Sequence, residues 1–125
     1  MRSALAFDIR NIMVDEFCAD LYNFKTINAA KDAIFKLNII ADRERKELTN
    51  LKKKMPIFAT ALATGEGLDR LKKEKVFCLV LGEEAHGLAD EIMKMADGAI
   101  KIKMSGKIES INVASASAII FHYIF

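Results

Sequence analysis

Short runs of apolar residues alternate with helical stretches along this chain, and the alternation limits the fold more than any other feature. Each run is rich in β-branched, aromatic or other apolar residues and has the length of a buried strand. The stretches between the runs carry apolar residues at helical spacing. The expected strands span residues 10–15, 36–41, 56–60, 76–81 and 99–103, and the expected helices span residues 26–35, 42–54, 68–73, 88–95 and 110–125.

Strands that alternate with helices predict an α/β fold, with a parallel sheet that helices flank and bury on both faces. The 125 residues suffice for one domain, residues 1–125, with a core of its own. Pro56 opens an expected strand, where its missing N–H costs least. Ser110 stands at the start of the last expected helix, and we expect its side chain to cap that helix.

Composition excludes several classes of protein. No apolar run approaches the roughly 18 residues of a membrane span, so we expect no membrane partner, and we see no secretion signal. Cys18 and Cys78 lie far apart and form no CxxC, which argues against a disulfide framework and fits a reducing, cytoplasmic location. The net charge of +2 is too small to indicate nucleic-acid binding by itself.

Ligands of open parallel sheets bind beyond the carboxyl ends of the strands, and glycines gather at those places here. They can bring a backbone close to a ligand, or they can simply turn the chain, and position alone favours the second explanation. No GxGxxG or Walker A pattern occurs. His86 and His122 have no further ligand at metal-binding spacing, so we expect no metal. The glycines are Gly65, Gly67, Gly82, Gly87 and Gly106.

Two segments resemble conserved motifs of the SpoU (TrmH-type) RNA ribose 2′-O-methyltransferases, within the SPOUT superfamily. Residues 79–88, LVLGEEAHGL, resemble the second motif of that family, LVLGNEGxGL. Residues 102–113, IKMSGKIESINV, resemble the third, IPMxGxxxSLNV. Residues 1–7, MRSALAF, look like the tail of the first motif, NxGaixRtAxAFG, and residues 18–39 also resemble the family. The resemblance covers the chain but leaves the family's first strand and first-motif asparagine upstream, as expected of an N-terminally truncated member.

The resemblance implies a parallel α/β sheet with a C-terminal trefoil knot, S-adenosylmethionine (SAM) held in the knot, and a homodimer whose RNA site uses both subunits. It implies methyl transfer to a ribose 2′-hydroxyl of rRNA or tRNA. A truncated or vestigial module that binds SAM or RNA without turnover is the alternative. Carried over by position, the cofactor-binding residues would be Thr60, Gly82, Ile102, Met104 and Ile111.

The same resemblance implies four catalytic residues. Arg2 matches the arginine that the family places at the target ribose. A guanidinium hardly ever loses its proton, so Arg2 is better suited to hold phosphate and stabilise a developing alkoxide than to act as a base. Glu84 would orient Arg2 through a charge-assisted bond, and Ser110 and Asn112 would shape the catalytic loop.

Cationic side chains near the cleft are expected to contact RNA phosphates, whereas a charge run on a helix is more often a solvated face. The first group comprises Lys101, Lys103 and Lys107; the charged helix carries Arg43, Arg45, Lys46 and residues 52–54. The chain departs from the motifs at Glu83, Ala85, Lys103 and Ile111.

Overall fold

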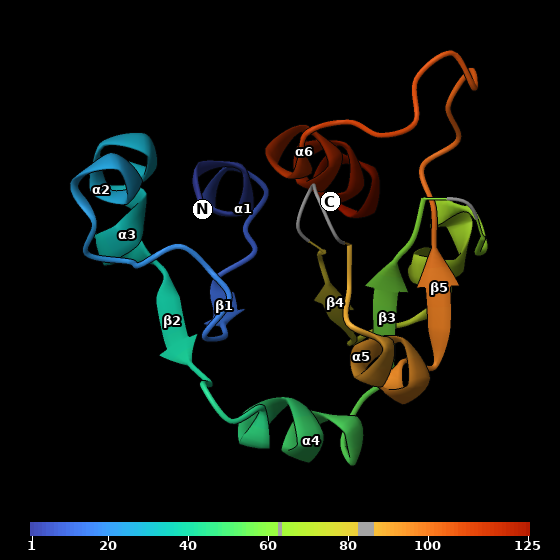
Figure 1. Ribbon diagram of the computed structural model, residues 1–125, viewed down its shortest axis with the longest axis horizontal. Coiled ribbons are helices and arrows are strands. Elements are labelled where there is room, and N and C mark those ends of the chain that lie inside the picture. The colour runs from blue at the N-terminus through green and yellow to red at the C-terminus, as the bar shows by residue number, and fades with distance from the viewer. Residues whose placement is uncertain (63, 83–86) are drawn as a thin grey trace.

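The computed structural model describes residues 1–62, 64–82 and 87–125. It has the α/β architecture that the sequence predicts, with five short strands and flanking helices (Figure 1). The described elements in chain order are α1 (Arg2–Ala6), β1 (Asn11–Val14), α2 (Phe24–Ala30), α3 (Ala33–Lys36), β2 (Asn38–Ala41), α4 (Lys46–Lys52), β3 (Ile57–Thr60), the 3-10 helix η1 (Leu68–Lys73), β4 (Cys78–Val80), α5 (Asp90–Met95), β5 (Gly98–Ile100) and α6 (Val113–Ile124).

The strands pair in parallel, but among the described residues they form two sheets instead of the single sheet expected. In the first sheet β1 pairs with β2, from Asn11 opposite Asn38 to Val14 opposite Ala41. In the second sheet β3 lies between β4 and β5. A cluster of apolar side chains joins the two sheets, because Met13 of β1 packs against the buried cluster that contains Ile57 of β3.

The core lies around β3. Ile57, Phe58 and Ala59 are fully buried, and Phe58 packs with Leu71 of η1 and with Ile120 of α6. The expected burial on both faces therefore holds for β3. It is wrong for β2, whose residues are exposed except for the half-buried Ile39, because β2 is a sheet edge that β1 covers on one side only.

Two local expectations are wrong. Residues 26–35 do not form one helix, because Lys31 has a φ of 53° and ends α2 before α3 begins. Ser110 does not cap α6. The N-cap is Asn112, whose side-chain oxygen accepts a 2.8 Å hydrogen bond from the N–H of Ala114. Asn and Ser are about equally good caps, so sequence alone does not choose between positions two residues apart.

The chain after β3 passes round the outer edge of β5. Ala61 donates its N–H to the carbonyl of Ile100 at 2.9 Å, on the side of β3. Glu66 then forms a one-residue bridge on the far side, donating to Ala99 at 2.8 Å and accepting from Lys101 at 2.9 Å. Gly65 permits this course: its φ is +126°, and a Cβ there would stand 2.7 Å from the carbonyl oxygen of Ala99. Ala61 and Glu66 thus contact β5 from opposite sides.

The helices at the two ends of the strands have different surroundings. At the carboxyl ends of β3, β4 and β5, α6 packs against α1 and against η1. Leu48 of α4 packs at the other end, and α4 lies there in Figure 1, far from α6. No helix in the described part of the chain is long and apolar enough to cross a membrane.

Candidate functional site

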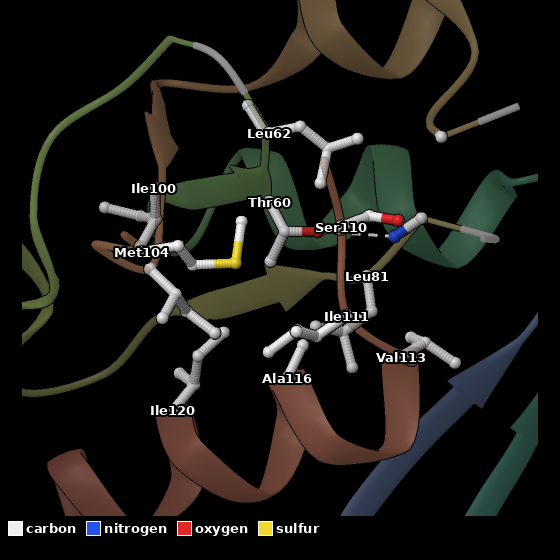
Figure 2. A pocket seen from close by; sticks show the side chains of 14 residues that line it. Thr60, Leu62, Leu81, Ile100, Met104, Ser110, Ile111, Val113, Ala116 and Ile120 are labelled. Carbon is white, nitrogen blue, oxygen red and sulfur yellow. Dashed lines mark hydrogen bonds between the residues drawn. The ribbon is translucent and has the colours of Figure 1, made fainter. Parts of the chain in front are cut away.

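A hollow lies beyond the carboxyl ends of β3, β4 and β5, where the parallel sheet predicts a ligand. Its enclosed space is about 90 Å³, and the whole hollow with its open mouth is about 690 Å³. Ligand pockets commonly measure about 300–1,000 Å³, so a cofactor would occupy the mouth as well as the enclosed part. Figure 2 shows side chains that converge on it from the strand ends, from the loop before α6 and from α6 itself.

Thr60 at the end of β3 holds the neighbouring loop in place. Its hydroxyl donates to the carbonyl of Val80 at 3.3 Å and accepts from the N–H of Gly82 at 3.3 Å; Figure 2 draws the second bond as a dashed line. The β4 strand end and the following backbone are thereby fixed to β3. The backbone of Gly82 also lies against Gly87, where an added Cβ would meet the carbonyl carbon at 2.7 Å.

The other wall comes from the segment after β5 and from α6. Ile102 and Met104 follow β5, and Ser110 and Ile111 precede α6. The sequence therefore brings the positions of the two motifs to one place. All five residues expected to bind the cofactor line this hollow, together with Ser110; their role in binding stays a prediction.

Several lining residues were missed by sequence reasoning. Val113, Ala116 and Ile120 lie three and four positions apart on one face of α6, so helical spacing could have identified them once Ile111 was chosen. Ile100 and Leu81 stand at strand ends, where only the pairing of the strands places them together. The remaining lining residues are Ala61, Leu62 and Gly87.

None of the described residues that line the hollow has an ionisable side chain. Its polar groups are the hydroxyls of Thr60 and Ser110 together with backbone N–H and C=O groups. The described residues also contain no group of three His, Cys, Asp or Glu that could hold a metal ion. A group that moves a proton in this hollow must therefore come from outside its described lining.

The predicted catalytic residues do not all meet here. Ser110 lines the hollow, and Asn112 caps α6 beside it. Glu84 lies outside the described residues. Arg2 is exposed on α1 and does not line the hollow. The pKa of Asp32, at the start of α3, is lowered mainly by its bond to Lys36, and the charge of Arg2 adds to that lowering.

The charged helix takes part in structure at the far end of the strands. Arg45 pairs with Asp15 at 3.5 Å and with Glu91 at 3.3 Å, and its guanidinium stands 5.3 Å from the ring centroid of Phe17. Lys52 pairs with Asp97. These contacts and the place of α4 in Figure 1 separate this basic run from the hollow.

The lining fits a flat apolar heterocycle with polar edges. Ile102, Ile111 and Leu81 offer apolar surfaces, and the backbone beside Gly82 can approach closely because no Cβ intervenes. Adenine recognised through backbone groups has this character. The residues present thus fit the adenosine part of SAM, and no charged side chain of the described lining would oppose a sulfonium.

The fold and the hollow define a class: an α/β protein with parallel strands whose ligand site lies between the strand ends and a C-terminal helix. Within that class the chain matches the model of the SpoU rRNA Methylase family over residues 1–122. The chain belongs to this family.

Two curated relatives are similar to it. One is the 23S rRNA (guanosine(2553)-2′-O)-methyltransferase RlmP of Bacillus subtilis, 25% identical over 125 residues, which cover 99% of this chain and 50% of the relative. The other is the tRNA (guanosine(18)-2′-O)-methyltransferase of Thermus thermophilus, 37% identical over 65 residues, which cover 51% of this chain and 34% of the relative. The chain thus spans half of the first relative's length.

Solved structures share the fold. The SpoU methyltransferase AviRb from Streptomyces viridochromogenes, in complex with the cofactor AdoMet, superposes with a TM-score of 0.88 at 21% identity, covering 98% of this chain and 49% of that chain. A TrmH-family putative RNA methyltransferase from Porphyromonas gingivalis gives a TM-score of 0.84 at 24% identity, covering 98% and 51%.

Proposed function

We propose that the protein is a SAM-dependent RNA methyltransferase that transfers a methyl group to a ribose 2′-hydroxyl of rRNA or tRNA. The observation that carries the proposal is the convergence of both family motifs on one hollow. Gly82 from the second motif and Ile102, Met104, Ser110 and Ile111 from the third line the same space at the strand ends. Family membership and the names of the two curated relatives support the same reaction.

In this proposal the hollow binds SAM, with Thr60 as a positioning residue for the backbone at Gly82. Ile102 and Ile111 would cover the faces of the adenine, and backbone groups would recognise its edges. When bound, SAM supplies a methyl group on a sulfonium that carries its own leaving-group activation. The residues of this chain then have to place the ribose hydroxyl, keep other water from the methyl group and stabilise the oxygen while its proton passes to solvent.

Arg2, Glu84, Ser110 and Asn112 are the residues proposed for those tasks. Ser110 is in position to touch a ligand in the hollow, and Asn112 fixes the start of α6 beside it. Arg2 would hold the phosphate next to the target ribose and stabilise the developing negative charge on oxygen. Glu84 would orient Arg2 by a charge-assisted hydrogen bond.

The proposal includes a homodimer, a trefoil knot and a location in the cytoplasm. Arg2 is exposed and does not line the hollow of its own chain, which supports a site completed by a second copy. Ala61 and Glu66 contact β5 from opposite sides, and the chain continues from β5 to α6; these contacts support the knot. The RNA substrates named for the relatives support the cytoplasm.

The test is methyl transfer from SAM carrying a labelled methyl group to bulk RNA, followed by digestion to nucleosides and mass spectrometry. The proposal expects label in 2′-O-methylated nucleosides, and expects Arg2→Ala to abolish transfer while S-adenosylhomocysteine still binds. Label found only in methylated bases would contradict the assignment of the ribose. Cofactor binding without any transfer would identify a binding module.

A further inference from the structure

A second hollow lies beside the first, on the segment between β5 and α6. Its space is about 260 Å³, larger than the enclosed part of the first hollow. It is lined by residues 101–104 on one limb of this segment and by Ile108 and Glu109 on the other. Figure 1 shows the segment as the long orange connection that stands out beyond the end of β5. The proposed reaction gives no role to this space.

The lining of the second hollow combines apolar walls with cationic groups. Leu62, Ile102, Met104 and Ile108 supply the apolar surface, and Leu62 and Ile108 are 60% and 57% exposed. Large apolar side chains that are exposed beside a cavity are typical of surfaces that bind a ligand or a partner. Lys101 and Lys103 supply two ammonium groups, and Glu109 supplies one carboxylate. The charge of the lining is therefore positive by one unit.

The two hollows share a wall. Leu62, Ile102 and Met104 line both, so a ligand in the second would lie directly next to a ligand in the first. Sites for single-stranded nucleic acid combine cations that follow the backbone with side chains, most often aromatic, on which bases lie. Here the described lining offers two lysines and aliphatic side chains, which give a base apolar contact without ring stacking. The described lining of the first hollow has no cation that could do this.

We propose that the second hollow binds one nucleotide of single-stranded RNA, a neighbour of the nucleotide that is methylated. The base lies between Leu62 and Ile108, and Lys101 and Lys103 hold the adjacent phosphate. Glu109 opposes the phosphate and limits the affinity. The inference rests on the proposed function in that RNA is the substrate, and it adds the surface on which that RNA lies.

The test measures binding of a fluorescently labelled single-stranded oligoribonucleotide by anisotropy at several salt concentrations. The double variant Lys101→Gln with Lys103→Gln is expected to bind about tenfold more weakly. The slope of log K against log salt should fall by about 0.7, because the two lysines hold one phosphate and each phosphate contact to a single strand contributes about 0.7. The matched control, Lys53→Gln with Lys54→Gln, removes the same charge next to α4 and should leave binding within twofold.

Two single variants separate the base from the phosphate. Glu109→Gln should tighten binding about two- to threefold, since it removes the opposing charge. Ile108→Ala should weaken binding about fivefold without changing the salt slope, because it removes apolar contact and no charge. Inorganic polyphosphate is tested as a competitor. If it competes as well as RNA of equal charge, and if Ile108→Ala does not change its binding, the nucleotide site is overturned in favour of a surface that binds any polyanion.

Each sample is also titrated with S-adenosylhomocysteine, so that failure of the proposed function can be recognised separately. Unchanged RNA binding in the Lys101 and Lys103 double variant overturns the second site, whatever the cofactor does. Loss of RNA binding in that variant, with the two control lysine changes neutral, supports the site even if the chain does not bind the cofactor.

Discussion

Gly82 and Gly87 lie with their backbones in contact at the mouth of the hollow. A Cβ on Gly82 would stand 2.7 Å from the carbonyl carbon of Gly87 and 3.0 Å from the nitrogen of Leu88. Those atoms belong to the backbone and cannot turn aside as the end of a flexible side chain would. The contact holds the backbone of Gly82 against that of Gly87, and both residues line the hollow.

Gly82→Ala is therefore expected to displace the loop and distort the wall of the hollow. Overpacking of this kind costs about 1–3 kcal/mol in stability, and we expect the affinity for S-adenosylhomocysteine to fall at least tenfold. Gly67→Ala is the control, because a Cβ at Gly67 meets nothing within 4 Å. Urea unfolding and calorimetric titration measure the two effects. Equal affinities in the two variants would contradict this account of the loop.

Thr60→Val removes the hydroxyl that joins β3 to the loop after β4 while keeping the shape of the side chain. The carbonyl of Val80 and the N–H of Gly82 would each lose a partner. We expect a loss of about 0.5–1.5 kcal/mol, the usual net contribution of a hydrogen bond, because both bonds are part-buried. Thr60→Ser keeps the hydroxyl and should lie close to the wild type. A Val variant as stable as the wild type would contradict this role of the hydroxyl.

Asp97 makes stability depend on pH in the acid range. The hydrogen bond from Lys52, and then that from the N–H of Ile57 at 2.8 Å, lower the pKa of Asp97 below its ordinary 3.8. A carboxyl whose pKa is lower in the folded state stabilises the fold above its unfolded pKa, and loses that contribution as the pH falls through the folded one. The free energy of unfolding should thus drop as the pH falls from about 5 to below 3.8.

Asp97→Asn is expected to flatten that drop, as measured by urea unfolding at a series of pH values. Lys52→Gln should lower stability near neutral pH, and the double variant should lose less than the sum of the single variants, since both remove the same ion pair. An unchanged acid dependence in Asp97→Asn would show that other carboxyls produce it.

Neighbouring isoleucines of α6 should respond differently to truncation. Ile120 is 1% exposed and packs with Phe58 and Leu71, whereas Ile119 is 43% exposed. We expect Ile120→Ala to cost about 2–5 kcal/mol, because it leaves a cavity in the core. Ile119→Ala should cost well under half of that. Similar losses of stability in the two variants, measured by chemical unfolding, would mean that α6 does not pack on the core through the face that carries Ile120.

The sequence predicted the strands and the hollow better than it predicted local turns and edges. Runs of apolar residues located all five strands to within about three residues, because burial around β3 imposes that pattern. The break at Lys31 was missed because a positive φ at a lysine leaves no compositional sign. The N-cap was misplaced because Ser110 and Asn112 have similar side chains for that purpose.

The candidate site was predicted from the motifs, which indicate functional positions but not the residues that these positions contact in the fold. Six of the lining residues came from the motifs and their neighbourhood, and the structure places all of them together. Leu62 and Ile100 could not be predicted in this way, since their place depends on how β3 and β5 pair and how the chain after β3 runs beside β5. Such long-range contacts are set by the whole core and not by any local pattern.

The central claim is that the hollow beyond β3, β4 and β5 binds SAM, and calorimetric titration of the folded chain with S-adenosylhomocysteine tests it most directly. The account predicts saturable binding of one ligand per chain, unchanged by Arg2→Ala and weakened at least tenfold by Gly82→Ala. A folded chain that does not bind the ligand, or binds it equally well after Gly82→Ala, would contradict the claim.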